Sequence, residues 1–185
     1  MKPSSSSFAL WALPSMLILF GFAMRLLPHA PNFAPIGAIA LFGGMYLPKR
    51  LAIILPLGAM LLSDSIIGFY SWQIMLSVYG SFALMGFIGL WLRRHKRFLF
   101  ILGGTLAGSI LFYLITNVAV WAFGTMYPHT LAGLMQSYVN ALPFFRNTLF
   151  GDALYVTLLV GGFEAMRYWI FSRSLVPKKL IPRSY

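Results

Sequence analysis

Residues 98–123 read FLFILGGTLAGSILFYLITNVAVWAF, an apolar run without a single charged side chain. About 20 apolar residues in a helix cross the hydrocarbon layer of a bilayer, so this run is long enough to span a membrane. A basic cluster, Arg93, Arg94, Lys96 and Arg97, stands immediately before it. Since Lys and Arg concentrate in cytoplasmic loops, the stretch predicts a transmembrane helix that starts on the cytoplasmic side.

The composition of the whole chain agrees with this interpretation. Of the 185 residues, 59% are hydrophobic and only 9% are charged, whereas about 25% are charged in a soluble domain. We therefore expect one integral membrane domain over residues 1–185. Topology and anionic lipid headgroups account for the net charge of +11, so no nucleic-acid partner is expected. The chain has no cysteine, which excludes disulfides and thiolate chemistry.

Five further segments approach the length of a membrane span, which predicts an all-α bundle of six transmembrane helices. The six segments are residues 8–27, 33–47, 51–70, 73–92, 98–123 and 144–171. The second is short and flanked by prolines, so we expect it to be tilted or irregular. Between the last two, a short outer helix is predicted at about residues 130–141, either as a lid or as a plain interfacial helix.

The basic residues orient these six spans. Of the 14 Lys and Arg residues, all but Arg25 and Arg146 fall on one side. That asymmetry places both ends of the predicted multi-pass protein in the cytoplasm. The residues on the cytoplasmic side are Lys2, Lys49, Arg50, Arg93, Arg94, Lys96, Arg97, Arg167, Arg173, Lys178, Lys179 and Arg183.

Charges on the outer half of such a protein are costly and are candidates for function. Asp64 lies about 22 Å across the membrane from Lys49 at about 1.5 Å per helical residue. Arg146 and Asp152 are six residues apart and face different directions on one helix. This favours pairing across helices, with Asp64 as the candidate partner of Arg146. The pair would either fix the helix packing or form a ligand site with Arg146 as donor.

Polar residues on the outer side complete the candidate site. The segment Leu27–Pro35 contains three prolines, which should hold His29 and Asn32 at defined positions. It is either a ligand-contacting loop or a simple connection between helices. The residues predicted to bind a substrate are His29, Asn32, Asp64, Tyr70, Ser77, Tyr79, Arg146 and Asn147.

Four stretches carry a resemblance to a known group of membrane proteins. They are LPHAPNFAPIGAIALFGG at 27–44, LLSD at 61–64 with YGSF at 79–82, MYPHTLAGL at 126–134, and LPFFRNTLFGD at 142–152. Together they resemble the substrate-binding S components of energy-coupling factor vitamin transporters, and within that group the solitary bacterial cobalamin transporters.

The resemblance implies a six-helix bundle with a cavity open to the outer side, in which His29, Asp64, Tyr79 and Arg146 match polar cavity residues. It also implies a place in a bacterial inner membrane, uptake of a vitamin-like solute, with cobalamin or another corrinoid first, and no dedicated ATPase module. The cobalamin branch ligates cobalt through a cysteine that this chain lacks. A serine such as Ser77 cannot replace a thiolate, which leaves His29 as the possible cobalt ligand.

The sequence offers less support for other classes of function. No metalloprotease, serine-hydrolase or Walker motif is present, so no enzymatic activity and no cofactor of its own are expected. His95 and His129 have no neighbouring ligand cluster, and Glu164 is expected to pair with Arg167 on the surface. Two alternatives remain: an S component for another vitamin that uses a separate coupling module, and a non-transporting membrane scaffold or assembly protein.

Overall fold

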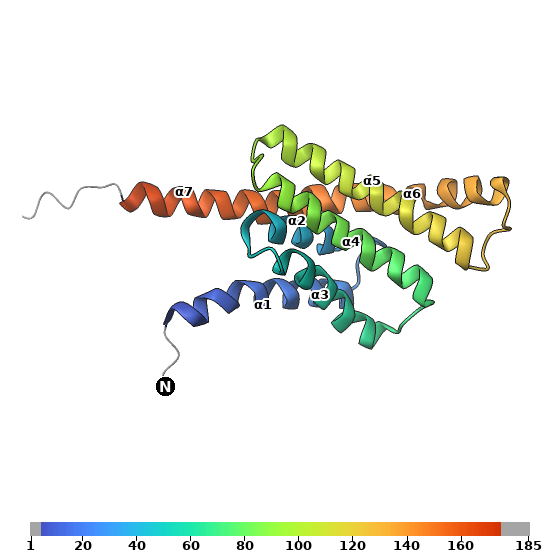
Figure 1. Ribbon diagram of the computed structural model, residues 1–185, viewed down its shortest axis with the longest axis horizontal. Coiled ribbons are helices and arrows are strands. Elements are labelled where there is room, and N and C mark those ends of the chain that lie inside the picture. The colour runs from blue at the N-terminus through green and yellow to red at the C-terminus, as the bar shows by residue number, and fades with distance from the viewer. Residues whose placement is uncertain (1–4, 175–185) are drawn as a thin grey trace, which may run out of the picture.

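Six helical rods make up the computed structural model, which describes residues 5–174 (Figure 1). A π-helical turn, η1, continues the sixth helix without a break into the seventh, so that these elements form one long rod. The elements are α1 (Ser5–Leu26), α2 (Ile36–Tyr46), α3 (Leu51–Ile67), α4 (Trp72–Leu92), α5 (Phe98–Phe123), α6 (Leu131–Val156), η1 (Thr157–Gly161) and α7 (Gly162–Ser174).

Three of these rods are long and apolar enough to cross a membrane, and shorter apolar helical stretches lie at Ala12–Leu26, Ile36–Tyr46 and Leu51–Ile67. The long ones are Trp72–Leu92, Phe98–Phe123 and Leu131–Trp169. Large apolar side chains such as Leu76, Phe87 and Ile110 are exposed on the outer faces of the long helices. Apolar surface of this extent would promote aggregation in water, so these faces are typical of contact with lipid.

The predicted helices at 51–70, 73–92 and 98–123 are confirmed to within a few residues. The separate outer helix at about 130–141 is wrong, because α6 begins at Leu131 and runs on through Pro143. Its first turns pack along α5, where Tyr113 Oη donates to the carbonyl of Tyr138 at 2.7 Å and Tyr138 Oη donates to the carbonyl of Leu114 at 3.0 Å. These bonds hold the segment against a neighbouring helix, so it does not lie across the mouth of the bundle.

Helix α2 is short, regular and central. It has 11 residues, ten of them buried, and at about 1.5 Å per residue it covers only half of a hydrocarbon layer of about 30 Å. The predicted second span at 33–47 therefore begins later than expected, at Ile36, and is not irregular. Helices α3, α4 and α6 surround α2, which lies near the middle of the bundle in Figure 1.

Glycines bring α2 and α4 into backbone contact. A Cβ placed on Gly44 would lie 2.5 Å from the carbonyl carbon of Gly89 and 2.6 Å from the carbonyl oxygen of Gly86. No real Cβ approaches a neighbour so closely without a backbone shift. Gly104 of α5 likewise lies close to α4, since a Cβ placed on it would be 2.8 Å from Cδ1 of Leu92.

The carboxyl end of α2 is bound by basic and acidic side chains from other helices. Arg93 donates from Nε and Nη2 to the carbonyl of Gly44, at 2.9 and 2.7 Å, and also to the carbonyl of Leu47. Tyr46 Oη donates to Glu164 at 2.6 Å, and Glu164 pairs with Arg167 at 3.2 Å as predicted. A cation at a helix carboxyl end satisfies free carbonyls and opposes the negative end of the helix dipole.

The connections of the chain divide between two ends of the bundle. The α2–α3 and α4–α5 connections lie toward the same end as α7, and the α1–α2, α3–α4 and α5–α6 connections lie toward the other (Figure 1). Most described Lys and Arg residues belong to the first group, as the predicted charge asymmetry requires. Lys2, Lys178, Lys179 and Arg183 lie outside the described residues.

The glycine contact gives a test of this packing. Gly44→Ala should lower the thermal unfolding midpoint of the detergent-solubilised protein, because the new methyl group forces α2 and α4 apart at a cost of about 1–3 kcal/mol. Gly103→Ala is the matched control, since a Cβ on Gly103 meets nothing within 4 Å; it should leave the midpoint unchanged or raise it. Equal midpoints for the two variants would contradict the close contact of α2 and α4.

Candidate functional site

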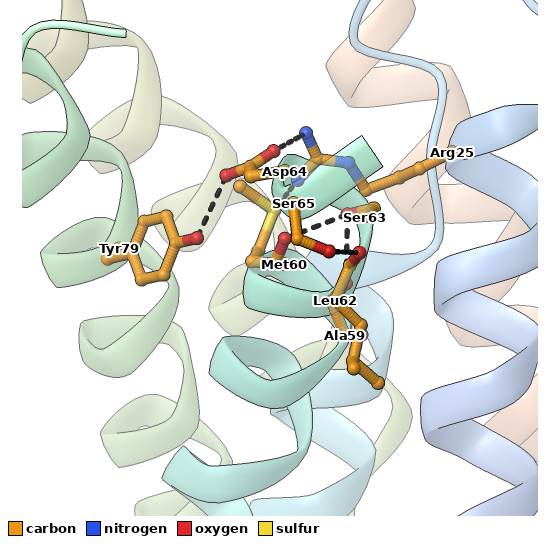
Figure 2. Close-up of polar contacts among 8 residues, drawn as sticks. All are labelled: Arg25, Ala59, Met60, Leu62, Ser63, Asp64, Ser65 and Tyr79. Carbon is orange, nitrogen blue, oxygen red and sulfur yellow. Dashed lines mark hydrogen bonds and ion pairs between the residues drawn. The ribbon is translucent and has the colours of Figure 1, made fainter. Parts of the chain in front are cut away.

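Asp64 stands at the centre of a polar group that joins three helices. Figure 2 shows its carboxylate between Arg25, from the last turn of α1, and Tyr79 of α4. Arg25 Nη2 lies 2.5 Å from Oδ1, and Tyr79 Oη donates to Oδ2 at 2.8 Å. The guanidinium also contacts the sulfur of Met60. Both oxygens of a carboxylate that is 1% exposed are therefore satisfied, as a buried charge requires.

The prediction that Asp64 pairs with Arg146 is wrong. Arg146 is exposed and forms no ion pair among the described residues, whereas Arg25 takes that place. The reason is which helices are neighbours: α1 contacts α3, which carries Asp64, while α6, which carries Arg146, contacts α2 and α5. Arg25, the other basic residue on this side of the predicted topology, is thus the one that Asp64 can reach.

The proline-rich loop between α1 and α2 has a defined conformation. His29 Nδ1 lies 2.6 Å from the carbonyl oxygen of Leu27, the Phe33 amide donates to the carbonyl of Ala30 at 3.0 Å, and Asn147 Nδ2 donates to the carbonyl of Pro31 at 3.0 Å. Because a carbonyl can only accept, Nδ1 of His29 carries the proton and Nε2 is left as an acceptor in the neutral ring.

Asn32 fixes the turn in this loop. Its φ angle of 63° is the only positive one among the described residues other than glycine, and asparagine is among the few residues that tolerate this left-handed conformation. Both His29 and Asn32 line a cavity beside the loop. The loop is therefore part of a cavity wall as well as a connection.

This cavity has a volume of about 340 Å³ and lies among the helix ends and the loop. That is within the range of about 300–1,000 Å³ that is typical of small-molecule sites. Its polar lining comes from segments far apart in the sequence. The charged and polar lining residues are Arg25, His29, Asn32, Tyr70, Thr148 and Asp152, and the apolar wall includes Ile36, Met60, Val78, Phe82, Met85 and Phe112.

Asp152 brings a buried carboxylate to this cavity, which Asp64 does not line. It is 4% exposed, and Ser109 Oγ of α5 donates to its Oδ2 at 2.7 Å. Its Oδ1 lies beside the first turn of α2: a Cβ on Gly37 would come within 2.5 Å of that oxygen. Gly37 thus gives the carboxylate room next to the amino end of α2, where the helix dipole favours negative charge.

The other residues predicted to bind a substrate take different places. Tyr70, in the α3–α4 connection, lines the cavity, and burial together with the nearby Asp64 carboxylate raises its pKa to about 12, so the phenol stays neutral. Ser77 bonds within its own helix, to the carbonyl of Ile74 at 2.7 Å. Asn147 holds the loop through Pro31, and neither Ser77 nor Asn147 lines the cavity.

A second cavity of about 350 Å³ adjoins the first and shares Asn32, Val78, Phe112 and Thr148 with it. Aromatic rings and neutral amides line it, among them Tyr113, Phe145, Asn117 and Asn140. Neither acidic nor basic residues belong to its lining. The two cavities therefore differ in charge although they share one wall.

Several functional candidates were missing from the predicted set. The sequence shows Arg25 and Asp152 as charges on the outer side of the predicted topology, which is a signal of function. Neither was included among the residues predicted to bind a substrate. Phe112 and Met85 carried no signal, because aromatic and thioether side chains are ordinary in apolar helices. Within the described residues, no group of three or more His, Cys, Asp or Glu residues could hold a metal ion.

Comparison with known proteins adds one finding. A family of unknown function (DUF6580) matches residues 5–175. The chain belongs to this family. No curated protein and no solved structure matches the sequence.

The ion pair between Arg25 and Asp64 predicts unequal effects of two substitutions. Asp64→Asn should destabilise the protein by about 1–3 kcal/mol, because it leaves the Arg25 charge without its partner. This is less than for a fully buried pair, since the Arg25 side chain keeps 16% exposure. Arg146→Gln should change the free energy of unfolding by no more than about 0.5 kcal/mol. Thermal unfolding in detergent would measure both, and a similar loss from Arg146→Gln would contradict this pairing.

Proposed function

We propose that this protein binds a small vitamin-like solute in the cavity of about 340 Å³ and acts in its uptake as a solitary protein of the S-component type. The observation that carries the proposal is the cavity itself. Arg25 of α1, His29 and Asn32 of the loop, and Asp152 of α6 converge on one space with an apolar wall. A concave, mostly apolar site with a few placed polar groups is typical of small-molecule binding.

The topology that goes with this proposal has both chain ends in the cytoplasm. The basic connections would then lie inside, following the positive-inside rule, and the α1–α2 loop would lie outside. The cavity is bordered by that loop and by Tyr70 of the α3–α4 connection. Solute would therefore enter from the outer face of a bacterial inner membrane.

The size of the cavity bears on the choice of solute. A corrinoid is much larger than a space of about 340 Å³, so it would need the two adjoining cavities to open into one. His29 still suits the role of a cobalt ligand, because ligating histidines commonly donate their other ring N–H to a backbone carbonyl, as Nδ1 can to Leu27 here. A smaller vitamin-like solute fits the cavity as it stands.

A structural role is the second candidate, and a specific observation favours it. Every polar atom of the Asp64 carboxylate is satisfied within the chain by Arg25 and Tyr79. This group therefore links α1, α3 and α4 without any ligand. A membrane scaffold or assembly protein would need no more than this.

Binding measurements distinguish the two candidates. The full-length protein, purified in maltoside detergent, would be titrated by equilibrium dialysis with cobalamin and a panel of smaller vitamins. We expect one member to bind, and His29→Ala to weaken that binding about tenfold, equivalent to about 1.4 kcal/mol. His129→Ala is the matched control, since His129 is exposed, packs on Trp121 and lines neither cavity.

The outcomes separate cleanly. Saturable binding that depends on His29 but not on His129 supports the uptake proposal, and a change in the visible corrin spectrum would add cobalt ligation. Failure of the whole panel to bind, with both variants as stable as the parent, would favour the scaffold.

A further inference from the structure

The acidic residues of this chain are few enough to be accounted for one by one. Against 14 Lys and Arg residues there are only three Asp and Glu residues. Asp64 pairs with Arg25 at 2.5 Å, and Glu164 pairs with Arg167 at 3.2 Å and with Lys96 at 3.8 Å. Asp152 forms no ion pair with any described residue. The one acid without a cationic partner is thus the one in the cavity.

One oxygen of Asp152 is available to a ligand. Oδ2 accepts from Ser109, but Oδ1 has no hydrogen-bond donor in the part of the chain that the structure describes. Among the described residues, every fully buried side-chain oxygen or nitrogen has a hydrogen-bond partner. Because Oδ1 has none, it is not fully buried. It lies beside Gly37, and both residues line the cavity. The carboxylate therefore presents an unused acceptor to the cavity.

Nothing in the described surroundings supplies the missing positive charge. Helices α2 and α5, which contact α6, contain no Lys or Arg, and Arg25 is already neutralised by Asp64. The amino end of α2 offers a partial charge of about half a unit, which reduces the cost of the buried carboxylate without cancelling it. An unpaired buried carboxylate in a membrane protein is costly, and such residues commonly mark a solute path.

The remaining walls suit a cation with an apolar body. Phe82 and Phe112 line the cavity with ring centroids 5.0 Å apart, and aromatic faces attract cations. Met60 and Met85 add polarisable thioethers. His29 contributes an acceptor at Nε2, because its Nδ1 faces the Leu27 carbonyl. Acceptors and π faces thus border the cavity, while its one cationic side chain is occupied.

We infer that Asp152 is the recognition carboxylate of this site and that the solute is a small organic cation, with an ammonium or similar group that meets Oδ1. This inference rests on the proposed function, because it names the chemical class of the solute that the cavity takes. It assigns different roles to the two buried carboxylates: Asp64 holds helices together, and Asp152 binds.

The test compares three probes of one size and different charge. Benzylammonium, benzyl alcohol and benzoate would be titrated at pH 7 into the full-length protein in maltoside detergent, with bound probe measured by equilibrium dialysis. We expect benzylammonium to bind about tenfold or more tightly than benzyl alcohol, as for a hydrogen bond to a charged group, and benzoate to bind least. Asp152→Asn should remove the preference for benzylammonium and leave benzyl alcohol binding unchanged.

The matched control is Ser137→Ala, a buried polar position on the same helix whose hydroxyl bonds within its own turn, to the carbonyl of Leu134 at 2.8 Å. It should keep the order of the three probes. If Asp152→Asn does not fold, the order of the probes on the parent protein decides. Equal binding of the three probes, no binding of benzylammonium, or full benzylammonium binding by Asp152→Asn would each overturn the inference.

Failure of this inference is distinguishable from failure of the proposed function. A vitamin that binds with dependence on His29 but is neutral or anionic, and is indifferent to Asp152→Asn, would keep the uptake proposal and refute the cation. Cation binding that depends on Asp152, with no vitamin bound, would keep the recognition carboxylate and leave the vitamin class refuted.

Discussion

A half-length helix buried at the centre of an apolar protein has both of its ends inside the protein, and the rest of this structure depends on which side chains lie at the two ends of α2. With ten of 11 residues buried, its terminal N–H and C=O groups have little access to water. At the carboxyl end, Arg93 donates to the carbonyls of Gly44 and Leu47. At the amino end, the Asp152 carboxylate lies beside Gly37. A base and an acid thus complement the helix dipole at opposite ends.

The two ends of α2 are nevertheless unlike, and that difference places the cavity. Beyond the carboxyl end, Tyr46, Glu164 and Lys96 form a compact group in which the lysine lies 4.1 Å from the tyrosine ring. Beyond the amino end, the first turn of α2 borders an open space of about 340 Å³. A half-length helix leaves room at the level where a full span would continue, and here the α1–α2 loop returns over that room without filling it.

Much of this architecture could be predicted from the sequence, and the failures have physical causes. Long apolar runs such as 98–123 fix their own secondary structure, because backbone groups in lipid must be satisfied within the helix. The predicted break between a short outer helix and the last span is absent: α6 runs on through Pro143, and the contacts of Tyr138 hold its first turns against α5. The partner of Asp64, Arg25, could not be predicted because it depends on which helices are neighbours. Hydrophobic periodicity does not reveal that. His29, Asn32 and Tyr70 were found because polar residues near the ends of apolar spans are few.

The comparison of Asp64 with Asp152 shows why charge alone did not identify the site. Both are buried, at 1% and 4% exposure, and sequence marks both as costly. Asp64 is bonded on both oxygens, to Arg25 and Tyr79, so its charge is used within the chain. Asp152 has a hydroxyl on one oxygen and a cavity at the other. The chain has many more basic than acidic residues, so its composition would allow an ion pair for Asp152. That no described base pairs with Asp152 reflects where the helices place their charges. An acid kept from cations of its own chain, at the edge of an aromatic cavity, is the arrangement that a cationic solute would complete.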